Sequence, residues 1–194
     1  MSSIALRPPT FSSAKPPPTY TSPTVSWLTE TWTVTHSTLP MWKNKRNVKI
    51  QYTPLPPSDA SIKEDDTDRI DDLVTYQSVS DEKVHAVHGV DKLASSGDSR
   101  DSWNWRGKGW LMIASSHWEI LGWGEEEGSG NKWVVTMFAK TLFTPAGVDV
   151  YSKDVAGLRE ETVDGIKKAL QQIDDEGVKQ LSGELFEIKH DGGD

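Results

Sequence analysis

Cysteine is absent from this 194-residue sequence, and its absence excludes several kinds of site. A chain without thiols has no disulfide, no thiolate nucleophile and no cysteine-ligated zinc or iron–sulfur centre. No window of about 18 apolar residues occurs, which excludes a membrane-spanning helix. The first twenty residues, MSSIALRPPTFSSAKPPPTY, lack the apolar segment of a secretory signal. We therefore expect a cytoplasmic protein.

The sequence signatures of several chemistries are missing as well. No HExxH metal motif, no phosphate-binding glycine loop and no GxSxG nucleophile elbow is present. His85 and His88 are three residues apart on an expected strand, so they face opposite ways and chelate a metal poorly. The formal net charge of −8 argues against general nucleic-acid binding. We expect no metal and no cofactor, with a haem on one axial histidine as the alternative.

Tryptophan is the residue that this sequence has in excess. It occurs nine times, and five of the nine lie in the stretch WNWRGKGWLMIASSHWEILGWG, residues 103–124. Indole rings are large and flat, and their N–H group needs a partner when it is buried. Such rings can line the cavity of a binding protein, or they can fill a core completely. The sequence leaves both possibilities open.

Alternating apolar and polar residues predict strands over most of the chain. Examples are VSWLTETWTVTHS (25–37), NVKIQYTPL (47–55) with Val48, Ile50 and Tyr52 inward, GKGWLMIASS (107–116) and KWVVTMFAKTLF (132–143). Polar connections such as 56–72 and 91–102 separate the strands, and only the end of the chain changes to helical spacing. We predict a mainly β protein, a single antiparallel up-and-down β-barrel of 8–10 strands with a C-terminal α-helix at 158–176. We expect residues 1–24 to form a disordered or loosely draped arm rich in proline, serine and threonine, 25–189 the barrel domain and 190–194 a tail. Residues 178–189 fit either a second helix or a closing strand.

The order of elements resembles the calycin group, which includes lipocalins, fatty-acid-binding proteins and nitrobindin-like barrels. The segment TETWTV (29–34), with a tryptophan early in the first strand, and the helix after the last strands carry the resemblance. Lipocalins open with Gly-x-Trp, whereas Glu30 stands here at the glycine position before Trp32. Stretches such as FTPAGVDVYS also resemble small uncharacterised fungal proteins. The resemblance implies a closed barrel that can hold one small ligand.

Four residues are candidates for catalysis. His117 and Glu119 are two apart on one strand, so their side chains project in parallel and can act as acid and base, or form an outward face opposite Trp118. Lys140, if buried, could act as a base or a Schiff-base amine, and its alternative is a solvated strand end. Arg106 could stack on an indole or bind a ligand carboxylate.

The expected ligand site uses aromatic and apolar residues together with a polar pair after the TPAG turn. Trp133, Met137 and their neighbours form the strand face that we expect to line the cavity. The binding candidates are Trp32, Trp105, Trp110, Trp118, Trp133, Met137, Phe143, Asp149 and Tyr151.

Three functions fit these features. The first is binding of a hydrophobic, aromatic or polycyclic small molecule in a tryptophan-rich barrel cavity. The second is a cofactor-free enzyme of secondary metabolism, an isomerase, cyclase or dehydratase, that uses the same cavity to orient its substrate. The third is a filled barrel with a structural or interaction role. Each of the three functions is compatible with a homodimer.

Overall fold

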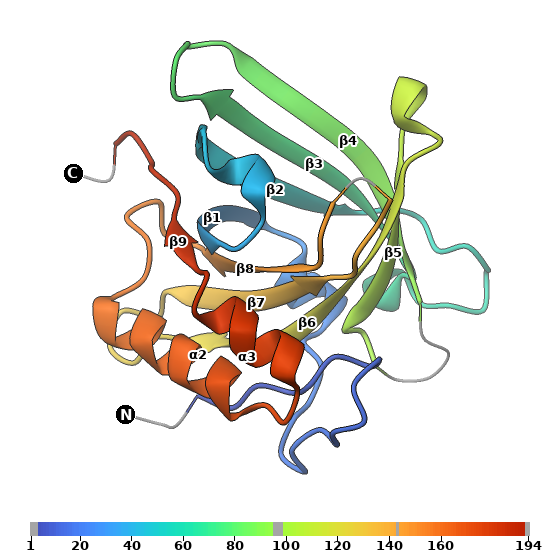
Figure 1. The fold of residues 1–194 in the computed structure, drawn as a ribbon. Helices are drawn as coiled ribbons and strands as arrows, with labels where there is room; N and C mark the ends of the chain where they lie inside the picture. The colour runs from blue at the N-terminus through green and yellow to red at the C-terminus, as the bar shows by residue number, and fades with distance from the viewer. Residues whose placement is uncertain (1–3, 95–98, 143, 193–194) are drawn as a thin grey trace.

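The computed structural model describes residues 4–94, 99–142 and 144–192, and its main body is a closed β-barrel (Figure 1). Each strand pairs antiparallel with the next along the chain, and β1 pairs with both β8 and β2, which closes the sheet. The predicted mainly β fold with an antiparallel up-and-down barrel is confirmed. The barrel strands are β1 (Thr31–Ser37), β2 (Lys45–Pro54), β3 (Arg69–Ser78), β4 (Val84–Leu93), β5 (Ser102–Gly107), β6 (Ser115–Glu125), β7 (Lys132–Phe138) and β8 (Gly147–Ser152).

Helices follow the barrel and cover one side of it. The helices α2 (Glu160–Gln172) and α3 (Glu176–Ser182) replace the single helix predicted at 158–176, and the short strand β9 (Phe186–Glu187) then pairs with β1. The chain divides there because the Asp175 side chain accepts the Val178 N–H at 3.1 Å and starts a new helix. The segment 178–189 thus contributes both to a helix and to the sheet. The tail is tied down as well, since His190 Nε2 lies 2.9 Å from the Val34 carbonyl oxygen.

Two apolar clusters separate the inside of the barrel from its helix-covered wall. The interior cluster includes Trp32, Ile50, Tyr52, Trp103, Trp118, Ile120, Val134 and Tyr151. The helix-side cluster joins the outward faces of β6, β7 and β8 to the helices through Leu121, Trp133, Val135, Met137, Val148, Val150, Ile166, Leu170 and Val178. Strands covered on both faces are apolar on both faces, so alternation alone does not identify the inner one.

This double burial overturns the predicted cavity face of β7. Trp133 and Met137 belong to the helix-side cluster, whereas Val134 and Phe138 pack in or against the interior cluster. Strand β7 also ends at Phe138, five residues earlier than predicted, which leaves Lys140 in the following loop. By contrast, the inward orientation predicted for Val48, Ile50 and Tyr52 on β2 is confirmed, since all three are buried in the interior cluster.

Several strand limits also differ from the prediction. The first strand does not begin at residue 25, because Thr24 caps the short helix α1 (Val25–Leu28) by accepting the Trp27 N–H at 3.1 Å. The strand expected at 107–116 is interrupted by a 3-10 turn, η3 (Gly109–Leu111), in which Gly109 has φ +60. Two further 3-10 turns, η1 (Pro40–Trp42) and η2 (Glu64–Asp66), lie in the loops after β1 and β2.

A bulge in β6 changes which residues face inward. The pairing of β6 with β7 shifts between Ile120 and Gly122, so that Trp123 pairs with the inward residue Val134. As a result Trp118, Ile120 and Trp123 all contact the interior cluster, although simple alternation placed Trp123 on the other face.

The N-terminal arm lies against the barrel wall instead of extending into solvent. Residues 4–24 run along β6, and the Arg7 N–H donates to the Leu121 carbonyl at 2.7 Å (Figure 1). Leu6 is buried against Gly122, where a Cβ atom would lie 2.2 Å from Leu6 Cδ2. Composition predicts a disordered or loosely draped arm, and in the described part a few long-range contacts place the arm against the barrel.

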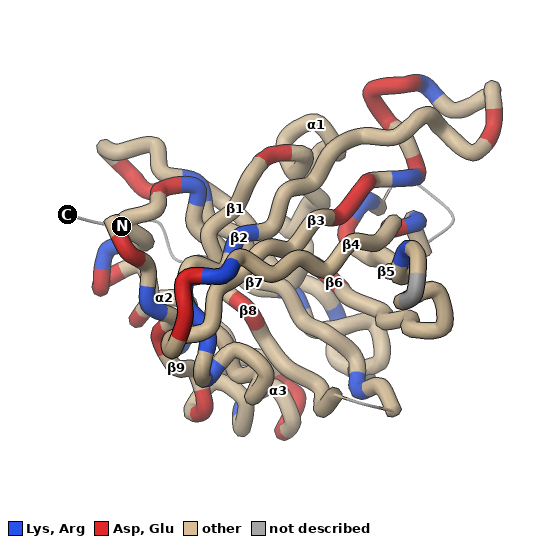
Figure 2. The backbone as a smooth tube through the Cα atoms, turned by 90° about the horizontal axis from the view of Figure 1, so that it is seen from above, with Lys and Arg blue, Asp and Glu red and all other residues tan. Residues whose placement is uncertain are grey.

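Charged residues are few on the strands β6, β7 and β8, which carry Glu119, Glu125, Lys132 and Asp149. In Figure 2 the tube is tan along most of β6 and β7, and blue and red positions gather in loops and helices. Among the described residues, no helix has both the length and the apolar character to cross a bilayer.

Candidate functional site

The interior cluster is built around a group of stacked aromatic rings. Trp118 is its centre: the Tyr52 ring lies 5.6 Å away at an interplanar angle of 8°, Trp103 at 6.1 Å and Phe138 at 6.4 Å. These rings come from four strands, and cross-strand pairing sets Trp103 and Phe138 directly beside Trp118. The site candidate Trp118 therefore faces inward.

Two carboxyl groups lie buried beneath these rings. Asp91 Oδ1 accepts the Trp118 indole N–H at 2.7 Å, and Asp72 faces inward on the neighbouring strand beside Tyr52. Burial raises the pKa of Asp91 to about 7, against a hydrogen bond from Trp118 that lowers it. Burial and the nearby Asp91 charge raise the pKa of Asp72 well above its ordinary value. Asp72 Oδ1 and Asp91 Oδ2 have no hydrogen-bond partner among the described residues.

The predicted polar pair Asp149 and Tyr151 lies inside the barrel on β8. Asp149 Oδ1 accepts the Ser37 hydroxyl at 2.5 Å, and burial raises the pKa of Asp149 to about 7. Burial also raises the pKa of Tyr151, whose fully buried hydroxyl has no hydrogen-bond partner among the described residues. The interior therefore combines an aromatic wall with polar atoms whose hydrogen-bonding capacity is not fully used, and such atoms are costly to bury.

The inward-facing side chains become more exposed toward one end of the barrel, here called the mouth. The mouth is the end that carries the loops after β1, β3, β5 and β7. Asp72, Asp91 and Trp118 are buried. The inward residues of β3, β4, β5 and β7 that are nearer the mouth are partly exposed: Val74, Tyr76, Val87, Trp105 and Phe138. Side chains from the interior are thus reachable from this end.

Trp105 sits on a glycine at this mouth. Asp72 pairs with Gly89 across the strands, and a Cβ atom added at Gly89 would lie 2.2 Å from Trp105 Nε1. The absence of a side chain at Gly89 lets the indole lie flat over the backbone of β4. Gly89 therefore fixes the position of a predicted ligand-binding residue.

Replacing Gly89 by alanine is expected to displace the Trp105 ring. The variant should lose about 1–3 kcal/mol of unfolding free energy, because the ring and the new methyl group cannot occupy the same space. Tryptophan emission and near-ultraviolet circular dichroism should change with it. Gly183→Ala is the matched control, since its Cβ atom would make an ordinary 3.5 Å contact. Identical spectra in Gly89→Ala and the unaltered protein would contradict this account of Trp105.

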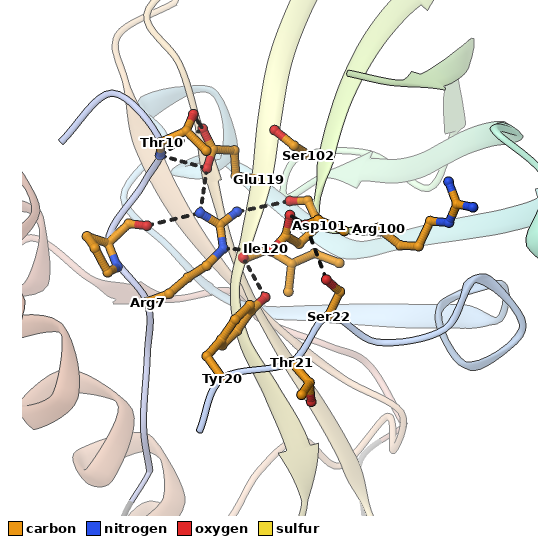
Figure 3. Close-up of polar contacts among 12 residues, drawn as sticks. Arg7, Thr10, Tyr20, Thr21, Ser22, Arg100, Asp101, Ser102, Glu119 and Ile120 are labelled. Atoms are coloured by element: carbon orange, nitrogen blue, oxygen red, sulfur yellow. Dashed lines mark hydrogen bonds and ion pairs between the residues drawn. The ribbon is translucent and has the colours of Figure 1, made fainter. Parts of the chain in front are cut away.

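The predicted acid–base pair lies on the outer wall of the barrel. His117 Nε2 is 3.2 Å from Glu119 Oε1, so the two side chains are close, and His117 Nδ1 is 2.9 Å from Asn104 Oδ1. Both residues face away from Trp118, which is the alternative in which they form an outward face of the strand. Arg7 Nη1 reaches Glu119 Oε2 at 2.8 Å from the N-terminal arm (Figure 3).

Glu119 is an anchor for the arm. Thr10 donates its backbone N–H at 2.9 Å and its hydroxyl at 2.5 Å to this carboxylate. Burial would raise the pKa of Glu119, but the hydrogen bonds from His117 and Thr10 and the charge of Arg7 outweigh it and hold the pKa at about 2. Arg7 Nε also pairs with Asp101 at 3.0 Å. A carboxylate held this firmly in its ionised form is a structural anchor and a poor proton carrier near neutral pH.

The remaining catalytic candidates also lie away from the interior. Arg106 is exposed on the outward face of β5 and donates from Nε to the Met112 carbonyl at 2.9 Å. Lys140 is exposed in the loop after β7. None of the four candidates faces the interior cluster, so the structure brings His117 and Glu119 together but does not join them to Arg106, Lys140 or the aromatic rings.

The binding candidates divide between the two clusters. Trp32 is fully buried near the end opposite the mouth, where its indole N–H donates to the Leu28 carbonyl at 2.9 Å. The Phe143 candidate and the side chain of Trp110 lie outside the described residues. The candidates that face the interior are Trp32, Trp105, Trp118, Asp149 and Tyr151.

Three charged residues of these sites were not predicted. Asp72 and Asp91 lay in segments that we assigned to polar connections, although each is next to a strong strand pattern. Arg7 lies in the proline-rich arm, 112 residues from Glu119, and no local pattern links the two.

Two cavities in the structure lie outside the barrel. One, of about 610 Å³, separates the arm and the β6–β7 hairpin from α2, and the other, of about 800 Å³, lies within the arm and beside Asp101. No group of three or more metal-ligating side chains occurs in the part of the chain that the structure describes.

Comparison with known proteins identifies the fold but no sequence family. No protein-family model and no curated protein matches this sequence. Among solved structures, lobster apocrustacyanin A1 is similar with a TM-score of 0.56 and 10% identity, over 87% of this chain and 80% of that one. Apocrustacyanin C1 is similar with a TM-score of 0.55 and 11% identity, over 84% and 78%. The chain has the calycin-like barrel fold that its sequence resembles.

Proposed function

We propose that the barrel binds one hydrophobic small molecule with an aromatic or polycyclic ring system, which enters through the mouth. The observation that carries this proposal is the gradient of exposure along the inward faces of the strands. Trp105, Tyr76 and Phe138 are partly exposed at the mouth, and they lead to buried carboxyl groups with unpartnered oxygen atoms. An apolar wall with a few convergent polar groups is the usual composition of a small-molecule site.

The aromatic wall favours a flat ligand. Trp118 and Tyr52 are almost parallel, and Phe138 continues the stack toward the mouth. A planar ring can continue such a stack in an offset arrangement, which is worth about 0.5–1.5 kcal/mol per ring pair beyond the apolar area that it buries.

The polar end favours a ligand that carries a hydrogen-bond donor. Asp72 and Asp91 are separated from solvent, and their free oxygen atoms can accept from a hydroxyl or an amine or, when the carboxyl is protonated, donate to it. A polar group that satisfies a buried acceptor gains more than it would in water, because the acceptor otherwise stays unpaired. A purely hydrocarbon ligand would leave this end of the site unsatisfied.

The enzyme alternative lacks support in the geometry. Its four candidate residues lie on the outer wall or in a loop, and Glu119 is committed to Arg7 and Thr10. The binding proposal needs none of them.

A titration with N-phenyl-1-naphthylamine tests the proposal, because this probe joins a polycyclic ring to one N–H donor. Its emission should rise to saturation at one probe per chain, while tryptophan emission falls. Trp105→Ala and Phe138→Ala should weaken binding at least tenfold, which corresponds to about 1.4 kcal/mol. Trp133→Phe is the control, since Trp133 belongs to the helix-side cluster.

The result that would overturn the proposal is a linear, non-saturating response of the unaltered protein. That outcome would favour a filled barrel with a structural or interaction role. Equal loss of binding in Trp133→Phe and Trp105→Ala would place the probe outside the barrel, for example in the cavity beside α2.

A further inference from the structure

Exposed apolar side chains of this protein gather at the mouth of the barrel. Large hydrophobic side chains are normally exposed one at a time, and an exposed group of them marks an interaction surface. The described residues include seven exposed large hydrophobic side chains, of which only Phe11 lies elsewhere, in the arm. The other six, here called the rim, are Met41, Val79, Val84, Met112, Ile113 and Leu142.

The topology explains why the rim residues share one end. In an up-and-down barrel the strands alternate in direction, so the connections after β1, β3, β5 and β7 meet at the same end. Met41 lies in η1, Val79 and Val84 flank the β3–β4 turn, Met112 and Ile113 follow η3, and Leu142 lies in the β7–β8 connection. Figure 1 shows the β3–β4 turn and the β5–β6 connection projecting at the top of the molecule.

Basic residues are interspersed with the rim. Six of them, Lys43, Lys45, Arg46, Lys83, Lys108 and Lys140, lie in or beside the same loops. The acidic residues there are Asp81 and Glu82, together with Asp191 and Asp71, which pair with Arg46 and Lys108. This end is therefore positive on a chain whose formal net charge is −8. Figure 2 shows the adjacent red and blue positions of the β3–β4 turn. Within the described residues, Lys43, Lys83 and Lys140 are exposed and form no ion pair.

We propose that the rim docks the mouth of the barrel on an anionic lipid surface. Ile113 and Leu142 are each 89% exposed, the most of any rim residue, and they project from two separate loops. Apolar tips of this kind can enter the headgroup region while neighbouring lysines remain at the level of the lipid phosphates. Lysines near such a surface are attracted to anionic headgroups.

Charge and shape favour lipid over a second copy of the chain. A twofold contact through the rim would place the same basic residues opposite one another, and the repulsion would oppose association. The rim also consists of side chains on separate loops and does not form a continuous flat face. The inference depends on the rim alone, so it stands whether or not the barrel binds a ligand.

Co-sedimentation with vesicles tests this docking. The unaltered chain should bind phosphatidylcholine vesicles that contain about 30 mol% phosphatidylserine at least tenfold more strongly than pure phosphatidylcholine vesicles, and added salt should weaken the binding. The double variant Ile113→Ser/Leu142→Ser should lose at least tenfold in affinity. Lys83→Glu/Lys140→Glu should lose the preference for phosphatidylserine. Phe11→Ser is the matched control, because it removes an exposed apolar side chain away from the rim.

Three outcomes would overturn the proposal. They are no binding to either vesicle, equal binding by the rim variants and the unaltered chain, and an oligomer in light scattering that the Ile113→Ser/Leu142→Ser variant abolishes. Circular dichroism melts of each variant establish that its fold is intact. Because the naphthylamine titration contains no vesicles, a failure of docking and a failure of ligand binding are recorded separately.

Discussion

Replacing Arg7 by methionine is expected to lower the free energy of unfolding by about 3–5 kcal/mol. Arg7 lies between Glu119 at 2.8 Å and Asp101 at 3.0 Å, and the side chains of all three are at most 8% exposed. Removing the cation leaves two acids together without their counter-charge, and methionine has a similar length but supplies no donor. Urea denaturation monitored by tryptophan emission measures the loss.

Two further variants make the Arg7 result specific. Lys15→Met is the matched control, because Lys15 is an exposed basic residue of the same arm and its replacement should change stability by less than about 0.5 kcal/mol. Arg7→Met/Glu119→Gln should recover part of the loss, since it removes one unpaired negative charge. A loss in Arg7→Met no greater than in Lys15→Met would mean that the arm does not depend on this ion pair.

Replacing Asp91 by asparagine is expected to stabilise the protein at alkaline pH and to make its stability fall less steeply with pH. A smaller fall remains, because burial also raises the pKa values of Asp72 and Asp149. Burial raises the pKa of Asp91 to about 7, so the unfolded chain releases this proton at lower pH than the folded one. Stability therefore falls as pH rises from about 4 to about 7, by up to about 4 kcal/mol for a shift of roughly three units. Asparagine cannot ionise, and its carbonyl can still accept the Trp118 N–H.

The measurement is the free energy of unfolding of both proteins between pH 4 and pH 8. The variant should be more stable by about 2–4 kcal/mol at pH 8 and close to the unaltered protein at pH 4. Asp71→Asn is the control with the opposite sign: although burial would raise the pKa of Asp71, hydrogen bonds from Lys108 and His88 lower it. If Asp91→Asn and the unaltered protein lose stability in parallel up to pH 8, the ionisation of Asp91 does not limit the fold.

Glu119 affects the acid side of the same profile. Its pKa of about 2 lies below the ordinary value of a glutamate. Ionised Glu119 therefore stabilises the folded chain at pH 5, and this stabilisation is lost as pH falls toward 2. The two groups act in opposite directions, and stability should be greatest near pH 4–5. Arg7→Met should reduce the acid-side slope only in part, because the hydrogen bonds from His117 and Thr10 lower the pKa of Glu119 more than the charge of Arg7 does.

Short-range alternation was sufficient to predict the barrel and part of its interior. Ile50 and Tyr52 face inward as their pattern indicates, and His117 and Glu119 lie opposite Trp118 as strand geometry requires. These features depend on residues within one strand, where side chains alternate with a period of two.

The features that the sequence did not predict depend on contacts between distant segments. The sequence pattern does not distinguish the inner face of β7 from the outer one. The outer face is also buried, because α2 covers it, so both Trp133 and Val134 lie in apolar surroundings. Asp72 and Asp91 were assigned to connections, since aspartate is rare in strands and only burial among other strands places it there. The ion pair of Arg7 with Glu119 joins segments that share no local signal.

The closure of the barrel also sets the order in which this chain can fold. Strand β1 pairs with β8, so Val34 must meet Tyr151, 117 residues later in the sequence. Contacts that span so much of a chain slow folding, because the loop must close before they form. During synthesis the edge of β1 that pairs with β8 remains open until β8 has left the ribosome, whereas the other edge can pair with β2. In the time between the synthesis of β1 and of β8, this open edge can pair with strands of other chains.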